Sequence, residues 1–267
     1  MESSNEEMGS LGRGRRALLR NLDSRKRSRE GRVLVEGGRT IREALAAGLP
    51  IDFGVVDTHY LHRPEGSELS NRLAARGVEV LEAGDVEYRE VAATEEPQGA
   101  LIVCVEPTPA LADLAPRAEA GILVLDGVQD PGNVGTLVRS AWALGAGGVI
   151  ALQGTADPWR PKAVRASAGG CFHLPLVRSS EEAFLAWVKE VGLQLLVASA
   201  DGDSPDSEQV RGGWALVVGN EAAGVRGAVV ESAERRVGVP MSGGAESLNA
   251  AVAGSILLYA IRRGGGR

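Results

Sequence analysis

The chain has few of the residues that build disulfide frameworks or metal sites. Its two cysteines, Cys104 and Cys171, lie far apart in the sequence and form no Cys-x-x-Cys pair. A disulfide scaffold and a zinc site are therefore not expected, and a reducing compartment fits. His59 and His62 are the only histidines close in sequence, and they lie in a polar stretch with no third ligand nearby. We expect no bound metal.

Long hydrophobic runs and targeting segments are also missing. No apolar run approaches the roughly 20 residues that a membrane-spanning helix needs. The first residues are polar and then arginine-rich, without the apolar core of a secretory signal, and Glu2, Glu6 and Glu7 disfavour a mitochondrial transit peptide. We therefore expect a cytoplasmic protein. With 267 residues, 44% of them hydrophobic, the chain can form one large or two ordinary globular domains.

Positive charge is scarce in the chain as a whole but concentrated near its start. Residues 13–32 hold nine basic and two acidic side chains, a net charge of +7, and because the whole chain carries −6 the remainder carries −13. Such a segment suggests a polyanionic partner. A solvated helix face or a disordered tail would have the same composition.

The order of helix and strand patterns predicts two α/β units. Residues 1–12 are polar and are expected to be disordered. Residues 13–106 alternate between helix and strand patterns, beginning with a basic helix, which implies an α/β layer structure. Three prolines in 14 residues mark 107–119 as a linker. Residues 120–267 begin with the apolar strand "GILVLDGV" and predict a mostly parallel sheet covered by helices.

Ligands of such sheets bind beyond the carboxyl ends of the strands, so the first loop to consider follows "GILVLDGV". Gly127 and Gly132 have the spacing of a phosphate-binding loop, but Asn133-Val134 stands where Lys-Ser/Thr is required, and no G-x-G-x-x-G follows a strand. An ATPase and a nucleotide-dependent oxidoreductase are therefore excluded. Asn133 is expected to cap the next helix. Arg139 within that helix is either a surface arginine or points back toward Asn133.

Two later loops carry further candidates. Glu221 follows a buried strand between glycines, and either belongs to a site or offsets the dipole of the next helix. Ser247 and Asn249 follow a Gly-Gly turn into the last helix, expected at about 246–262, and either cap that helix or face a substrate. Apolar residues occupy nearly all faces of this helix. It must be buried on more than one side, as a dimer interface would bury it.

Taken together, the three loops resemble the SpoU (TrmH) family of the SPOUT superfamily, the RNA ribose 2′-O-methyltransferases. The family pattern N-x-G-x-x-x-R matches Asn133–Arg139, and G-x-E-x-x-G matches Gly219–Gly224. The pattern P-M-x-G-x-x-x-S-L-N matches Pro240–Asn249. The stretch "GRVLVEGGRTIREALAAG" is similar to the substrate-binding domain common in this family, which resembles kink-turn-binding ribosomal proteins.

The resemblance implies a fold and an activity. The C-terminal part would be a SPOUT α/β domain with a deep trefoil knot, and the protein would be a homodimer. It would transfer a methyl group from S-adenosylmethionine to a ribose 2′-hydroxyl of RNA, with 23S ribosomal RNA favoured and transfer RNA as the alternative. No metal is needed. A non-catalytic RNA-binding or ribosome-assembly protein that retains the fold is the rival interpretation.

The resemblance also assigns roles to individual residues. The catalytic set is Asn133, Arg139, Glu221, Ser247 and Asn249, in which Arg139 acts either as a base or as an orienter of the ribose. The cofactor set is Gly219, Glu221, Val239, Met241 and Leu248. The expected RNA contacts are the basic residues Arg13, Arg15, Arg16, Arg20, Arg25, Lys26, Arg27, Arg39 and Arg165.

Overall fold

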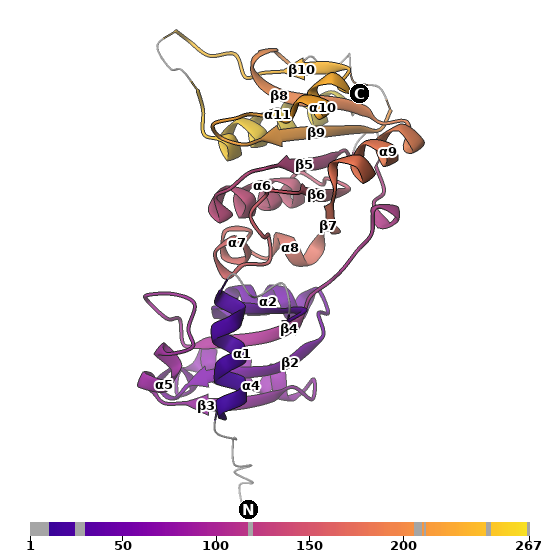
Figure 1. The fold of residues 1–267 in the computed structure, drawn as a ribbon. Coiled ribbons are helices and arrows are strands. Elements are labelled where there is room, and N and C mark those ends of the chain that lie inside the picture. The colour runs from indigo at the N-terminus through magenta and orange to yellow at the C-terminus, as the bar shows by residue number, and fades with distance from the viewer. Residues whose placement is uncertain are drawn as a thin grey trace, which may run out of the picture. The chain divides into compact units, whose positions relative to one another are not determined.

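The computed structural model describes residues 11–24, 30–116, 120–205, 210, 212–243 and 247–265. The chain forms two compact units, one of residues 1–106 with 159–161 and the other of residues 107–158 with 162–267 (Figure 1). Residues 1–10 of the expected tail, and Arg25, Lys26 and Arg27, lie outside the described residues. Leu11 was expected in that tail but is buried in the core of the first unit, because its apolar side chain packs there.

The first unit contains a four-stranded sheet in the order β1-β4-β2-β3. The strands are β1 (Arg32–Glu36), β2 (Ile51–Asp57), β3 (Glu79–Ala83) and β4 (Ala100–Val105). Strand β4 runs antiparallel to both of its neighbours, and only β2 and β3 pair in parallel. The expected alternation is present, but it does not determine strand direction, because β4 is inserted between two strands that precede it.

Helices cover both faces of this sheet. They are α1 (Arg13–Asp23), α2 (Gly38–Ala46), α3 (Thr58–Leu61), α4 (Pro64–Ala74) and α5 (Asp85–Arg89). Leu19 and Leu22 of α1 and Tyr88 of α5 share one hydrophobic cluster with the sheet. On the other face, Leu73 of α4 packs over Gly54 of β2. Helix α1 is therefore part of the core and not only a charged surface element.

The second unit contains a six-stranded sheet in the order β10-β8-β9-β5-β6-β7. The strands are β5 (Ile122–Asp126), β6 (Gly148–Leu152), β7 (Leu176–Ser179), β8 (Gln194–Asp203), β9 (Trp214–Gly219) and β10 (Arg235–Val237). Every pairing between neighbouring strands is parallel, which confirms the expected parallel sheet. The sequence did not indicate β7, because only Leu176 and Val177 of this short strand are apolar and buried.

Helices again cover both faces, as Figure 1 shows. They are α6 (Pro131–Ala143), α7 (Pro161–Ala166), α8 (Gly170–His173), α9 (Glu181–Val191), α10 (Gly227–Glu231) and α11 (Ala250–Gly265). Phe184 of α9 and Val229 of α10 belong to the hydrophobic cluster on one face of the sheet. On the other face, Gly254 of α11 lies against Leu137 of α6 and Val218 of β9. Among the described residues, no helix is long and apolar enough to cross a membrane.

The proline-rich segment after residue 106 packs with the second unit. A short 3₁₀ helix, Leu111–Asp113, forms within it, and Asp113 accepts a hydrogen bond from the backbone N–H of Ala110 (2.8 Å). Leu114 is a member of the core of the second unit and Leu111 packs against that core. The described part of this segment therefore behaves as an extension of the second unit.

Candidate active site

The loop after β5 presents the side chain of Asn133. Asp130, not Asn133, caps α6, because Pro131 occupies the first helical turn and the backbone N–H of Asn133 donates to Asp130 Oδ1 (3.0 Å). This corrects the expected cap. Lys162 Nζ lies 2.7 Å from the other oxygen of Asp130, and that hydrogen bond lowers the pKa of the carboxyl. The side chain of Asn133 is left available for other contacts.

The loop after β9 is a tight turn that presents Glu221. The backbones of Asn220 and Gly224 bond to each other in both directions (2.9 and 3.0 Å), and Gly224 has a φ of +71°. A Cβ on Gly219 would lie 2.3 Å from the carbonyl carbon of Gly224, so only glycine fits there. Glu221 precedes α10 by six residues and does not lie in its first turn. Offsetting the dipole of α10 is therefore not its role.

The third loop ends at Asn249, which caps α11. Asn249 Oδ1 accepts hydrogen bonds from the backbone N–H groups of Ala251 (2.9 Å) and Val252 (3.2 Å). The helix thus begins at Ala250, later than the expected 246, because Asn249 satisfies its first donors. Ser247 is exposed and precedes the cap.

One chain of hydrogen bonds joins all three loops. Asn249 Nδ2 donates to Asn133 Oδ1 (3.1 Å), and Asn133 Nδ2 donates to Glu221 Oε1 (2.8 Å). The backbone N–H of Gln129 donates to the second oxygen of Glu221 (3.4 Å). Burial alone would raise the pKa of Glu221, but the hydrogen bonds, chiefly that from Asn133, outweigh it and lower the pKa. The series of hydrogen bonds therefore ends at the carboxylate of Glu221, which is ionised at neutral pH.

The loop after β9 and the loop before α11 line a cavity of about 650 Å³ in the second unit, and Asn133 bonds to both of these loops from the loop after β5. The residues expected to hold a cofactor all line it, together with Ser247 and Asn249: Gly219, Glu221, Val239, Met241 and Leu248. Part of the wall was not anticipated, since Ser199 and Ala200 at the end of β8 also line the cavity. Their position at the carboxyl end of a parallel strand is the signal that could have identified them.

Arg139 and Arg165 lie outside this series of hydrogen bonds, as Ser247 does. Arg139 is exposed on α6 and takes no part in it. Six residues along a helix rotate a side chain by about 240°, so Arg139 and Asn133 leave α6 on different faces. Arg165 on α7 is half-buried, and its Nη1 atom is buried without a hydrogen-bond partner among the described residues.

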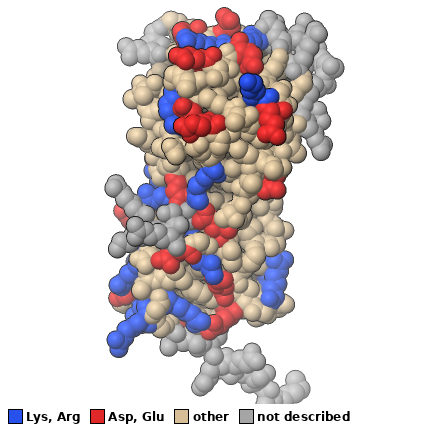
Figure 2. Space-filling view, turned by 45° about the vertical axis from the view of Figure 1, so that its right-hand side comes forward, with Lys and Arg blue, Asp and Glu red and all other residues tan. Residues whose placement is uncertain are grey.

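Three of the four basic residues of α1 are engaged in ion pairs within the first unit, and the fourth, Arg13, is exposed. Arg15 contacts Glu79 (2.5 Å), Arg16 contacts Glu87 (2.6 Å), and Arg20 contacts Glu90 (3.0 Å). On the face drawn in Figure 2, basic and acidic side chains are interspersed, with no continuous basic patch. Acidic partners therefore neutralise much of the positive charge of α1 at the surface of the first unit.

Comparison with known proteins identifies the family. The model of the SpoU rRNA methylase family matches residues 120–259, and the model of the MRM3-like substrate binding domain matches residues 17–101. The chain belongs to the SpoU rRNA methylase family. This SpoU protein is 33% identical over 240 residues to the 23S rRNA (guanosine(2553)-2′-O)-methyltransferase RlmP of Bacillus subtilis, covering 89% of this chain and 91% of the relative. It is also 33% identical to the 23S rRNA (uridine(2479)-2′-O)-methyltransferase of Streptomyces viridochromogenes, over 91% of this chain and 86% of that protein.

Solved structures agree with this assignment over nearly the whole chain. The SpoU methyltransferase AviRb of Streptomyces viridochromogenes, in complex with S-adenosylmethionine, matches with a TM-score of 0.83 and 30% identity, over 94% of this chain and 98% of that one. An rRNA methyltransferase of Sinorhizobium meliloti bound to the same cofactor matches with a TM-score of 0.83 and 30% identity, over 95% and 96% of the two chains. The SpoU protein is an S-adenosylmethionine-dependent RNA methyltransferase.

Proposed function

We propose that the protein methylates a ribose 2′-hydroxyl of 23S ribosomal RNA. The observation that supports this most strongly is the series of hydrogen bonds from Asn249 through Asn133 to Glu221, because it ties the loop after β5 to two distant loops that line one cavity. The activities of the relatives RlmP and the Streptomyces viridochromogenes enzyme point to the same atom of the same class of RNA.

The cavity suits S-adenosylmethionine. Its volume lies within the range of small-molecule sites, roughly 300–1,000 Å³. Apolar side chains that could hold the adenine include Val218, Val239 and Leu248, while the glycine at 219 permits close approach of the backbone to a ligand. Bound there, the cofactor supplies an activated methyl group.

The polar wall of the cavity would position the ribose. Transfer forms a bond between the 2′-oxygen and the methyl carbon and releases the hydroxyl proton. Asn133, Glu221 and Asn249 hold one another in fixed orientations, so they can orient that hydroxyl together with Ser247. A guanidinium is not deprotonated in proteins. We therefore assign Arg139 the role of orienting the ribose and its phosphate rather than that of a base.

The first unit would bind the RNA. Residues 13–106 form this substrate-binding unit, with the architecture of kink-turn-binding ribosomal proteins, and 107–119 connect it to the methyltransferase unit, 120–267. Arg13 and Arg39 are exposed and form no ion pair with described residues, so they are the favoured phosphate contacts. Arg165, with its unpaired Nη1, is a further candidate in the second unit.

A knot and a homodimer complete the proposal. A Cβ on Gly202 of β8 would lie 2.5 Å from the backbone of Val237, a close crossing of the kind that a trefoil knot needs. On α11, Val252, Ile256 and Tyr259 share one face and are each more than 40% exposed, although they are apolar or aromatic. We assign this face to a second copy of the chain. The assembly would act in the cytoplasm.

Mapping of 2′-O-methylation in cellular RNA tests this function. A strain that lacks the protein should lose one methyl mark in 23S ribosomal RNA, and the purified protein should restore it in vitro with S-adenosylmethionine. A mark lost from transfer RNA instead would contradict the assigned substrate. Cofactor binding without any missing mark would favour a non-catalytic RNA-binding protein.

A further inference from the structure

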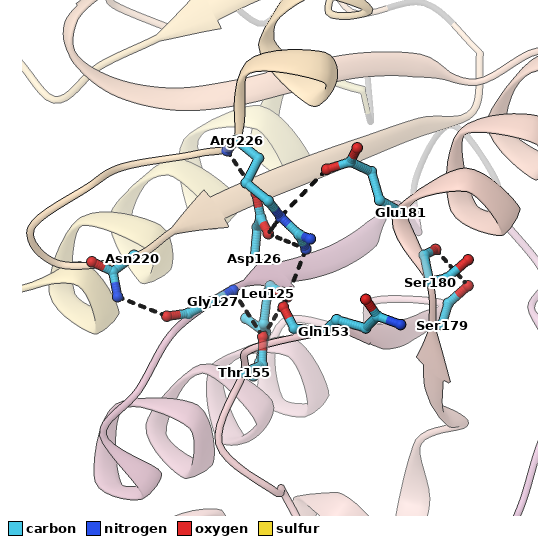
Figure 3. A network of polar contacts seen from close by, with 10 residues as sticks. All are labelled: Leu125, Asp126, Gly127, Gln153, Thr155, Ser179, Ser180, Glu181, Asn220 and Arg226. Carbon is cyan, nitrogen blue, oxygen red and sulfur yellow. Dashed lines mark hydrogen bonds and ion pairs between the residues drawn. The ribbon is translucent and has the colours of Figure 1, made fainter.

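The loop that presents Glu221 is tied to the end of β5 at both of its ends. At its start, Asn220 Nδ2 donates to the carbonyl of Gly127 (2.9 Å). At its end, Arg226 donates twice to Asp126, from the backbone N–H to Oδ2 (2.8 Å) and from Nε to Oδ1 (2.6 Å). Figure 3 shows these contacts side by side at the carboxyl ends of β5 and β9.

Asp126 needs Arg226 because it is buried. Its side chain is 1% exposed, and it lies opposite Gly219 in the register of β5 and β9. A buried carboxylate without a charged partner is strongly disfavoured. The hydrogen bond that Arg226 donates to the side chain of Asp126 raises the pKa of Arg226, as expected for a pair that stabilises both charges.

Arg226 is itself held in place by two further contacts. Its Nη2 donates to the carbonyl of Gln153 (3.2 Å), and its Nε lies 3.4 Å from Glu181 Oε2. Nearby, Thr155 Oγ1 donates to Leu125 O (2.8 Å) and accepts from the backbone N–H of Gly127 (3.0 Å). The anchor of the loop is thus a network that spans β5, the loop after β6, and α9 (Figure 3).

We infer that Arg226 and Asp126 are positioning residues for the methyltransferase site. The residues between Gly219 and Val225 form one wall of the cavity, and Glu221 within them meets Asn133. The loop itself is short and its residues 221–224 are exposed, so its own packing does little to fix its place. The Arg226–Asp126 pair fixes that place from outside the cavity. This inference rests on the proposed function for its effect on catalysis, but not for its effect on the loop.

Three variants separate positioning from folding. Arg226→Gln leaves the carboxylate of Asp126 without a charged partner but keeps the backbone hydrogen bond from residue 226. Arg226→Lys keeps a charge near Asp126. The pair Asp126→Asn with Arg226→Gln removes both charges, so no buried charge is left without a partner. Arg178→Gln is the matched control, because Arg178 lies 2.6 Å from Asp157 with a similar exposure but outside the loop.

Amide hydrogen exchange, cofactor calorimetry and steady-state kinetics on the 267-residue chain provide the readouts. In Arg226→Gln we expect the amides of residues 221–225 to exchange at least about tenfold faster, with those of β9 unchanged, and the KM for S-adenosylmethionine to rise about tenfold with a smaller change in kcat. Arg226→Lys should recover part of the affinity. The double variant should recover the melting temperature but not the affinity.

The outcomes distinguish this inference from the proposed function. Unchanged exchange in the loop, or a double variant with both the stability and the cofactor affinity of the wild type, would overturn the positioning role. A wild-type protein that bound S-adenosylmethionine but methylated no ribosomal RNA would contradict the proposed substrate. The hydrogen-exchange measurement would still test the positioning role of the Arg226–Asp126 pair.

Discussion

At the scale of single residues, the amide of Asn133 has a defined polarity. Its oxygen accepts from Asn249 and its nitrogen donates to Glu221, so an aspartate at this position could make only one of these two contacts. It would also place two carboxylates side by side, which raises the pKa of one of them. The hydrogen bond to Glu221 therefore requires the amide donor of Asn133, which an aspartate of the same size lacks.

This polarity leads to a prediction about pH. In Asn133→Asp we expect the rate of methyl transfer at pH 8 to fall at least about tenfold, since a repulsion of one pKa unit is worth about 1.4 kcal/mol. As the pH falls toward about 5, one of the paired carboxylates begins to take up a proton and the defect should shrink. The wild type should show no such gain, because the lowered pKa of Glu221 keeps it ionised throughout this range.

The pH profile of the rate, measured for both proteins, checks this prediction. Asn133→Ala serves as the control, because it removes the donor without adding a charge and should show a defect that does not depend on pH. A defect in Asn133→Asp that stayed constant from pH 8 to about 5 would rule out the pairing of the two carboxylates.

Arg139 yields a second prediction at this scale. Arg139→Ala should lower the rate of transfer by about 100-fold, the loss that a misplacement of the reacting group by about 1 Å can cause. The affinity for S-adenosylmethionine should stay within a few-fold, because Arg139 does not line the cavity. Single-turnover rates and calorimetry check these two expectations. A large loss of cofactor affinity would contradict the role of Arg139 as an orienter of the ribose.

At the scale of elements, α11 packs in the second unit with one face, and we propose that it packs against a second copy of the chain with the other. Its start is fixed by Asn249, and its buried side, with Leu257 and Ile261, packs in the second unit. The opposite face exposes Val252, Ile256 and Tyr259 at intervals of four and three residues. This spacing places them in one stripe, the arrangement expected of a helix that also packs against a partner.

Glutamate substitutions on this stripe should dissociate the proposed dimer. Val252→Glu with Ile256→Glu would bury two charges in the proposed interface, which we expect to weaken association by at least about 100-fold. Light scattering after gel filtration should then report the mass of one chain instead of two. Val86→Glu, at an isolated exposed position in the first unit, is the control and should leave the mass unchanged. A double variant that remained dimeric would place the interface elsewhere.

The helices of the first unit differ in how their arginines are engaged. Arg20 on α1 pairs with Glu90, whereas Arg39 on α2 is exposed and pairs with no described residue. Arg39→Gln should therefore reduce the slope of log affinity for RNA against log salt concentration by about 0.7–0.9, the value for one phosphate contact. Arg20→Gln, the matched comparison, should reduce it less. Equal slopes for the two variants would show that the ion pair on α1 opens when RNA binds.

At the scale of the whole molecule, the parts predicted from the sequence were those with a local signal. Glu221 after a buried strand and Asn249 before an apolar helix could be identified because each stands in a short, recognisable context. The direction of β4 could not, because pairing with β1 and β2 is a long-range choice. Nor could the contact between Asp126 and Arg226, which lie 100 residues apart and meet only once the sheet has formed.

The central claim is that three loops far apart in the sequence form one site for a methyl donor. A crystal structure of the protein soaked with S-adenosylmethionine tests it most directly. We predict density for the cofactor in the cavity, in contact with Gly219, Val239 and Leu248 and close to Glu221. Density for the cofactor at any other place, with this cavity left empty at saturating concentration, would contradict the account.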